Sequence, residues 1–190
     1  MTPYTDKTTI ENYLLQSIDS SFDDQISAWI LAMSRYIDKK CNRIIFDDTE
    51  STVLYDGDDT NLLHIQDCNS ISEVLLNNVD ITSSIFEYPS NKQYTSRIVV
   101  DPNGLIGKFT QGFQNVSVTG IQAMHSELPE DIKLACTILV AGIINNSILG
   151  NKAGSTERIG NYLVTYRTPS QQQDFASIQS ILSTYTRIAL

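Results

Sequence analysis

Residues 22–41 read FDDQISAWILAMSRYIDKKC and carry the clearest helical pattern in the chain. Their apolar side chains recur every three or four residues, the period of one face of an α-helix. Asp23 and Asp24 stand at the start, and Lys39 and Lys40 at the end, as the helix dipole favours. The pattern predicts an amphipathic helix with Ser21 as its N-cap. Its apolar stripe consists of Phe22, Ile26, Trp29, Ile30, Met33 and Ile37.

Helical patterns also occur before and after this stretch. Thr8–Glu11 has the form of a capping box and predicts a short first helix. Pro129 precedes two acidic residues and a segment, 132–148, that is apolar on most sides. Such a helix is buried either in the core or in a subunit interface, and the pattern does not decide between the two. Pro169 opens a predicted last helix.

The segment 47–122 has a different texture, with short alternating runs separated by turn residues. Asp56-Gly57 lies between two such runs, 52–55 and 62–66, and indicates a β-hairpin. Further strands are predicted at 71–76, 85–88, 97–100 and 115–120, and a strand or hairpin arm at 159–166. The predicted fold class is α+β. A helical core formed by residues 1–46 and 123–190 carries an inserted small antiparallel β domain, residues 47–122.

Negative charge is concentrated in the middle of the chain. Residues 47–128 hold 3 basic against 12 acidic side chains, whereas the whole chain has a formal net charge of −9. This balance argues against sequence-independent binding of nucleic acid, which needs Lys and Arg to neutralise phosphates. It is compatible with a protein past which DNA slides. Lys39, Lys40 and Arg43 form a small basic group, either ordinary helix C-terminal cations or an anion-binding patch.

The sequence contains few features that indicate a cellular compartment. Cys41, Cys68 and Cys136 are odd in number and widely spaced, which indicates neither a disulfide framework nor a zinc site. The first ten residues are polar, so we expect no signal peptide. The longest apolar run, 134–144, is too short to cross a bilayer, and we expect no membrane contact.

A search for catalytic chemistry finds no convergent set of titratable residues. His64 and His125 lie in separate segments without evident partners. Asp56, Asp58 and Asp67 match some positions of a calcium loop, but the glycine required at its sixth position is missing. We therefore expect no catalytic, cofactor or metal residues, and a protein that is not an enzyme. A calcium- or sugar-binding module built on the β insert is an alternative.

Six segments follow one another in a recognisable order: FDDQI (22–26), YIDKKCNR (36–43), YDGDDTN (55–61), NVSVTG (115–120), LPEDIKLA (128–135) and IGNYLVTY (159–166). In this order they resemble the head–tail connector (adaptor, or head-completion) proteins of long-tailed bacteriophages. The resemblance covers most of the chain, and the long β middle departs from the smaller members of that family.

The resemblance implies a structural virion protein made in the host cytoplasm and located at the head–tail interface. Such adaptors form a dodecameric ring on the portal protein and extend the channel for genomic double-stranded DNA, which they do not bind sequence-specifically. They also provide a platform for a stopper or tail-completion protein. From family habit we expect portal contacts at Tyr185, Arg187 and Leu190. Subunit contacts are expected at Ile132, Leu139 and Ile143. A different neck or tail-completion protein of the virion is an alternative.

Overall fold

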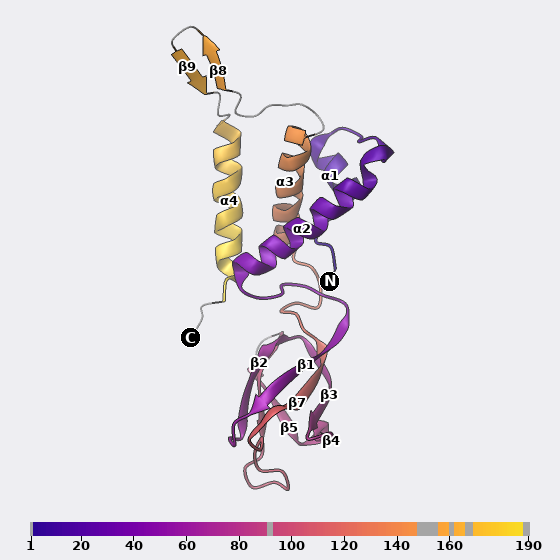
Figure 1. Cartoon of the computed structure of the whole chain (residues 1–190), viewed down its shortest axis with the longest axis vertical. Coiled ribbons are helices and arrows are strands. Elements are labelled where there is room, and N and C mark those ends of the chain that lie inside the picture. The colour runs from indigo at the N-terminus through magenta and orange to yellow at the C-terminus, as the bar shows by residue number, and fades with distance from the viewer. Residues whose placement is uncertain (1, 91–92, 148–155, 160–161, 166–168, 188–190) are drawn as a thin grey trace. The chain divides into compact units, whose positions relative to one another are not determined.

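The computed structural model describes residues 2–90, 93–147, 156–159, 162–165 and 169–187. The chain divides into two compact units, a helical unit (3–42 and 128–190) and a β unit (1–2 and 43–127). The predicted α+β class is confirmed, because four α-helices and antiparallel sheets make up the fold (Figure 1). None of the described helices combines the length and the apolarity that crossing a membrane requires.

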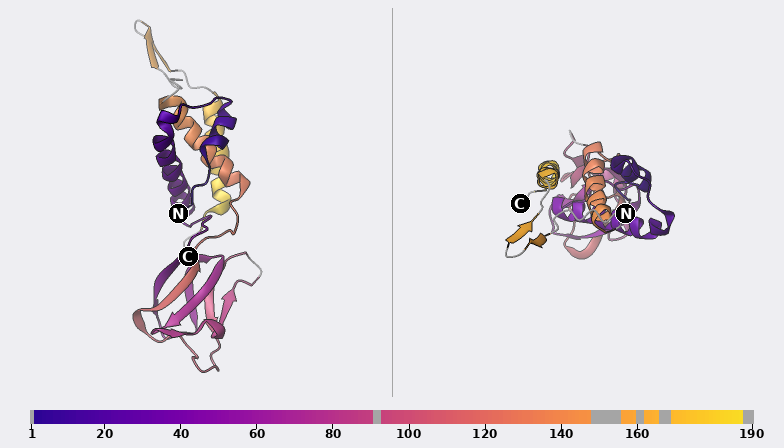
Figure 2. Two further views of the ribbon diagram at one scale, coloured as in Figure 1. Left: turned by 90° about the vertical axis from the view of Figure 1, so that its right-hand side faces the viewer. Right: turned by 90° about the horizontal axis from the view of Figure 1, so that it is seen from above.

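The helical unit is built around α3 (Glu130–Ser147), which contacts α1 (Lys7–Leu14), α2 (Asp23–Cys41) and α4 (Pro169–Tyr185). Figure 2 shows these helices from two further sides. The contacts explain why α3 is apolar on most sides, since three helices cover it. A two-stranded hairpin, β8 (Thr156–Ile159) with β9 (Tyr162–Thr165), precedes α4. Buried apolar side chains of this unit include Ile10, Ile26, Ile30, Ile37, Ile132, Ala135, Cys136, Val140, Ala141, Ile144, Ile178 and Leu182.

Both predicted N-caps are wrong. The Asp6 side chain, two residues before Thr8, caps α1 by accepting a hydrogen bond from the Thr9 amide at 2.8 Å. Ser21 does not cap α2, because a 3₁₀ turn, η1 (Ser20–Phe22), precedes that helix and is itself capped by Asp19. In each case a carboxylate accepts the bond in place of the expected hydroxyl, and an acceptor at a helix N-terminus gains from its negative charge.

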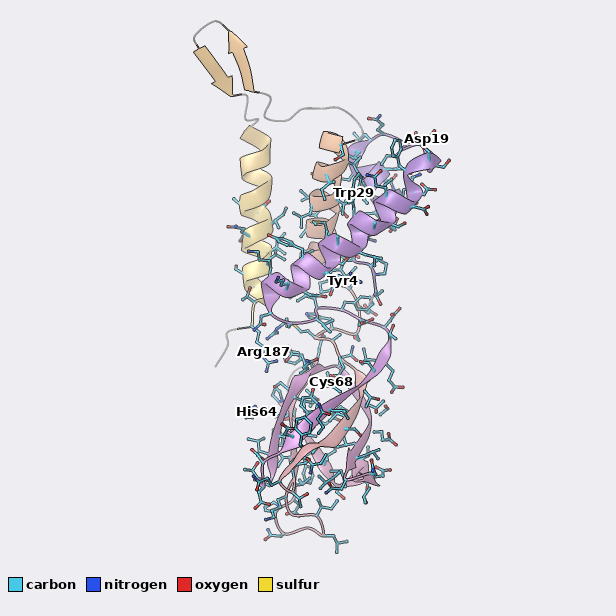
Figure 3. All side chains as sticks on the ribbon, in the orientation of Figure 1. Tyr4, Asp19, Trp29, His64, Cys68 and Arg187 are labelled. Carbon is cyan, nitrogen blue, oxygen red and sulfur yellow. The ribbon has the colours of Figure 1, made fainter. Side chains whose placement is uncertain are left out.

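The segment before α1 is part of the core of the helical unit, which the sequence pattern did not indicate. Tyr4, which is labelled in Figure 3, lies outside any helix and is buried, and so is Thr5. The Tyr4 amide donates to the Ser34 hydroxyl at 3.0 Å, and its phenol donates to Asp38 at 2.5 Å. The hydroxyls of Thr5 and Thr137 lie 2.7 Å apart. These bonds satisfy polar groups that would otherwise be costly to bury between α2 and α3.

The β unit contains two antiparallel sheets that enclose one apolar core. In the first sheet, β7 (Gly112–Ile121) lies between β1 (Glu50–Gly57) and β3 (Ser70–Leu76), and β3 also pairs with β4 (Val79–Asp80). In the second, β6 (Thr95–Val100) lies between β2 (Leu62–Cys68) and β5 (Ile85–Tyr88). The core takes side chains from both sheets: Leu63, Ile65, Cys68, Val74, Leu76, Ile81, Ile98, Val100, Phe109, Val116 and Val118.

The predicted hairpin at Asp56-Gly57 is wrong. β1 pairs with β7, and β2 pairs with β6, so the turn carries the chain from one sheet to the other. A Cβ atom on Gly57 would lie 2.1 Å from the Thr110 carbonyl oxygen. Glycine therefore serves close backbone approach at this point instead of a two-residue hairpin turn.

Candidate functional site

The three residues predicted to contact a neighbouring subunit lie at different depths on α3. Ile132 is enclosed by its own unit, with 0% of its surface exposed. Leu139 and Ile143 are half-buried and reach the surface. Leu139 and Ile143 are therefore accessible to a neighbouring subunit, whereas Ile132 packs in the core of its own unit.

Leu139 also lines a groove of about 220 Å³ formed by α2, α3 and α4, which we call the α2–α4 groove. Small-molecule pockets usually measure roughly 300–1,000 Å³, while an apolar cavity of about 150 Å³ holds benzene. The groove thus suits one or two apolar side chains. The Lys40 ammonium lies 5.7 Å from the centroid of the Tyr36 ring at this groove, which adds a positive charge. The lining residues are Tyr36, Lys40, Leu139, Ile178, Gln179, Leu182, Ser183 and Thr186.

Two of the three residues predicted to contact the portal fasten the end of α4 to its own unit. The Tyr185 hydroxyl donates to the Asp131 carboxylate, at 2.9 and 3.0 Å from its two oxygens. Burial, together with this carboxylate, raises the pKa of Tyr185 to about 12. The Arg187 amide donates to the Cys41 carbonyl at 2.8 Å. Leu190 lies outside the described residues.

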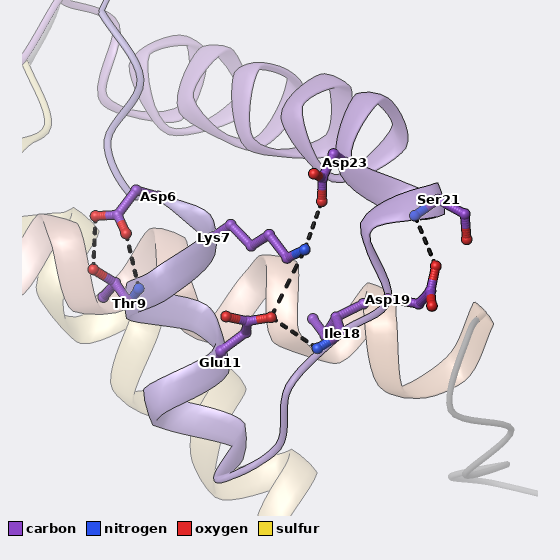
Figure 4. A network of polar contacts seen from close by, with 8 residues as sticks. All are labelled: Asp6, Lys7, Thr9, Glu11, Ile18, Asp19, Ser21 and Asp23. Carbon is purple, nitrogen blue, oxygen red and sulfur yellow. Dashed lines mark hydrogen bonds and ion pairs between the residues drawn. The ribbon is translucent and has the colours of Figure 1, made fainter.

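The other end of the helical unit carries an acidic network, drawn in Figure 4. Lys7 links α1 to α2, with its ammonium 2.5 Å from Asp23 and 3.8 Å from Glu11. The same Glu11 oxygen accepts the Ile18 amide at 2.8 Å. Asp19 accepts the Ser21 amide at 2.8 Å, and hydrogen bonds from Ser21 lower the pKa of this carboxyl. Three carboxylates, Glu11, Asp19 and Asp23, therefore act on one lysine here, and the exposed Asp24 follows Asp23 in the chain.

Many carboxylates of the β unit are engaged in their own turns. Asp58 accepts from the Thr60 hydroxyl at 2.7 Å, and Asp80 accepts from the Thr82 hydroxyl at 2.6 Å. These hydrogen bonds, first from the hydroxyl and then from the backbone amide, lower the pKa of both carboxyls. Many acidic side chains of this unit therefore stabilise turns, and these carboxyl groups remain ionised at neutral pH.

The three carboxylates that resemble a calcium loop have separate partners. Asp56 accepts the Gln114 amide at 2.6 Å, while Asp58 bonds within its turn. Asp67 is buried on β2, with its Oδ2 atom 3.2 Å from Arg43 Nε. Within the described ranges, no group of three or more His, Cys, Asp or Glu side chains could hold a metal ion. The geometry gives no support to a calcium module.

The Arg43–Asp67 ion pair was not evident from the sequence, because 24 positions separate the two residues. Their side chains are only 11% and 3% exposed. The Nε–Oδ2 pair lies at ion-pair distance without hydrogen-bond alignment, and the guanidinium lies 5.5 Å from the Tyr94 ring centroid. Both residues belong to the β unit, and Arg43 is the first residue of this unit after α2.

The remaining residues with reactive side chains have ordinary surroundings. His64 is exposed on β2, and His125 Nδ1 lies 3.3 Å from the side-chain amide oxygen Oε1 of Gln93. All three cysteines are buried, and none of them forms a disulfide. Burial raises the pKa of Cys68 and of Cys136 to about 11, so both thiols are protonated at neutral pH and poorly nucleophilic.

The sequence matches no protein-family model and no curated protein. Among solved structures, the chain is similar to one from a structure described as "Neck of empty GTA particle computed with C6 symmetry". The TM-score is 0.61 at 8% sequence identity, and the match covers 96% of this chain and 89% of the other. At this identity the likeness shows a shared fold.

Proposed function

We propose that this protein is a head–tail connector of a tailed bacteriophage or phage-like particle, and not an enzyme. The observation that carries the proposal is the shared fold with a chain in the neck of a GTA particle, over 96% of this chain. The order of sequence segments that resembles phage adaptors supports the same function independently. In this proposal the protein is a structural component of the virion, located between the head and the tail.

The connector forms a closed ring of identical subunits, a dodecamer by analogy with the adaptor family. A ring requires two different contact surfaces on each subunit, because each copy meets its neighbours head to tail. Leu139 and Ile143 contribute to one of these surfaces, since they are the partly exposed members of the predicted set. The C6 symmetry belongs to the neck that contains the similar chain, and it is compatible with twelve copies.

The ring docks on the portal protein through its C-terminal segment and supports a stopper or tail-completion protein on the opposite side. Arg187 and Leu190 are our candidates for portal contact. Tyr185 acts as the anchor that holds this segment near α3, because its hydroxyl bonds Asp131. The ring extends the channel for genomic DNA, and the acidic β unit favours passage over binding, because ionised carboxylates repel phosphates.

Electron microscopy of the purified protein, alone and mixed with the portal protein of the same virus, tests this function. We expect rings, either free or formed on the portal. A protein that stays monomeric and does not bind the portal refutes the proposal. Truncation after Thr186, which leaves the α2–α4 groove complete, should abolish portal binding while retaining rings. Binding that survives the truncation moves the docking surface elsewhere.

A stopper or tail-completion role in the same neck is the second candidate. The similar chain is described only as part of a neck, which suits either position. Labelling the protein in intact particles separates the two roles, because a connector lies directly against the portal, whereas a stopper lies one ring further away.

A further inference from the structure

The connection between α1 and η1 displays an apolar residue in an unusual conformation. Leu15 follows the C-terminus of α1 with φ 53°, in the left-handed region, and 92% of its surface is exposed. Its amide bonds the Asn12 carbonyl at 3.4 Å, and the Gln16 amide bonds the Glu11 carbonyl at 3.2 Å, as in a Schellman motif. Glycine or asparagine usually fills this position, and Asn42 (φ 54°) does so after α2.

Leu15 therefore destabilises its own unit in two ways and gives it no packing in return. A branched side chain in the left-handed region is strained, and a fully exposed leucine buries no apolar surface. Tyr13, two residues earlier, is also exposed, at 44%. We call Tyr13 and Leu15 the α1 knob. An exposed apolar group on a strained backbone is a feature expected of a contact surface.

The α2–α4 groove has room for an apolar side chain. It is lined by apolar groups from Tyr36, Leu139 and Leu182, and its volume of about 220 Å³ accommodates a leucine side chain. The groove adjoins the C-terminal end of α2, whereas the knob precedes the N-terminal end of this helix. The 19 residues of α2 span about 28 Å, so the two features lie at opposite ends of the unit.

The charges at the two ends are also complementary. Around the knob stand Glu11, Asp19, Asp23 and Asp24 with a single lysine, Lys7, which already pairs with two of them. Near the groove stand Lys39 and Lys40, of which Lys40 lines it. Of the carboxylates at that end, Asp38 accepts from Tyr4 and Asp131 accepts from Tyr185, whereas Glu130 is exposed beside Asp131.

We infer that the α1 knob of one copy inserts into the α2–α4 groove of the next, and that this contact joins the subunits of the ring. Such an interface is heterologous, as closure of a ring requires. Apolar insertion supplies the anchor, and the opposed charges supply orientation and steering. The inference rests on the proposed ring assembly, for which it names one interface.

Disulfide trapping tests the contact directly. In the double variant Leu15→Cys/Gln179→Cys, each copy carries one new thiol on the knob and one beside the groove, and both positions are exposed. Under mild oxidation we expect a ladder of covalent multimers on a non-reducing gel. Either single variant should give at most dimers. The native cysteines are buried and do not contribute.

A second variant separates assembly from folding. Leu15→Asn removes the leucine of the α1 knob and installs the residue that α2 uses at the equivalent position. The melting temperature should therefore stay constant or rise while rings are lost. Leu134→Asn is the matched control, because it removes another exposed leucine of the same unit that does not line the groove. This control should keep its rings.

Three outcomes are decisive. A ladder in the double variant, with ring loss confined to Leu15→Asn, supports the contact. The contact is overturned if Leu15→Asn still forms rings like those of the wild type, or if the double variant cross-links no further than the single variants. Either result leaves the proposed connector function in place. A wild-type protein that forms no oligomer, with or without the portal, overturns both.

Discussion

The buried Arg43–Asp67 pair gives the sharpest test of how the β unit is stabilised. Substituting Arg43 by Met removes the guanidinium that lies beside the Asp67 carboxylate, which is only 3% exposed. At 3.2 Å and an effective dielectric constant of 20, the lost attraction is about 5 kcal/mol before desolvation is considered. Breaking a buried pair from one side typically costs about 3–5 kcal/mol. We expect Arg43→Met to destabilise the β unit by an amount in this range.

Urea denaturation followed by two probes measures this effect. Trp29 is the single tryptophan and lies in the helical unit, so its fluorescence reports that unit, whereas far-ultraviolet circular dichroism also reports the sheets. With a slope of about 1.5 kcal/mol per M urea, the β-unit midpoint should fall by about 2–3 M. The control is Arg43→Met/Asp67→Leu, which removes both charges and should recover most of the loss, because the pair lacks hydrogen-bond alignment. A loss below about 1 kcal/mol in the single variant would mean that the carboxylate is solvated, and the argument would fail.

Four further substitutions test other parts of the structure. Gly120→Ala places a Cβ atom 2.1 Å from the Ser70 carbonyl oxygen in the middle of the first sheet and should cost at least about 3 kcal/mol in urea denaturation; Gly142→Ala, which meets nothing within 4 Å in α3, should instead gain about 0.5–1 kcal/mol, and equal effects would contradict the packing described. Asp6→Ala should cost about 1 kcal/mol at pH 7 through loss of the α1 cap. Hydrogen bonds from Thr9 lower the pKa of Asp6 in the folded state, so the stabilisation by Asp6 is present above its unfolded-state pKa and is lost as the pH falls through its folded-state pKa. The cost of Asp6→Ala, measured by thermal unfolding, should therefore shrink in acid. A cost that does not change with pH would refute the charged cap. Tyr185→Phe should cost about 1–2 kcal/mol in thermal unfolding while keeping portal binding, and loss of binding without loss of stability would make this hydroxyl a portal contact.

Helix positions could be predicted because their signals are local. The period of residues 22–37 is sufficient to place α2, and the acidic residues after Pro129 place the start of α3. The details that failed depend on tertiary contacts. Ser34 interrupts the stripe and yet is buried, because its hydroxyl bonds the Ile30 carbonyl and accepts from the Tyr4 amide. Nothing in a helical period indicates that an N-terminal segment will supply such a donor.

Strands could be placed, but their pairing could not. The alternating runs predicted at 85–88 and 115–120 lie within β5 and β7. Asp56-Gly57 nevertheless failed as a hairpin signal, because β1 finds its partner about 60 positions away at Tyr55–Val116. A turn dipeptide specifies backbone conformation, whereas the sheet in which the next strand is placed depends on which apolar face must be covered. Long-range pairing of this kind has no local signature.

The candidate assembly surface could not be predicted from the sequence, for a similar reason. The α2–α4 groove combines residues from three helices that are far apart in the chain, such as Tyr36, Leu139 and Leu182. Leu15 reads as an ordinary apolar residue after Leu14, and only its positive φ and its exposure mark it as unusual. Sequence reasoning placed one groove residue, Leu139, on the correct helix, and it also selected Ile132, which the core encloses.

The proposed contact bears on the charge that the proposed ring would present to DNA. Lys39 and Lys40 are exposed on α2, where cations would attract the phosphates of a passing duplex. In the proposed ring, the acidic end of the neighbouring copy, with Asp19 and Asp24, would lie against them. The same contact that joins the subunits then neutralises a basic surface, and carboxylates such as Asp58, held ionised by their turns, set the sign of the exposed charge. We therefore expect monomeric Leu15→Asn to bind duplex DNA weakly at low salt and the assembled ring to bind less per subunit, as measured by fluorescence anisotropy; a ring that binds more tightly would refute this account of charge.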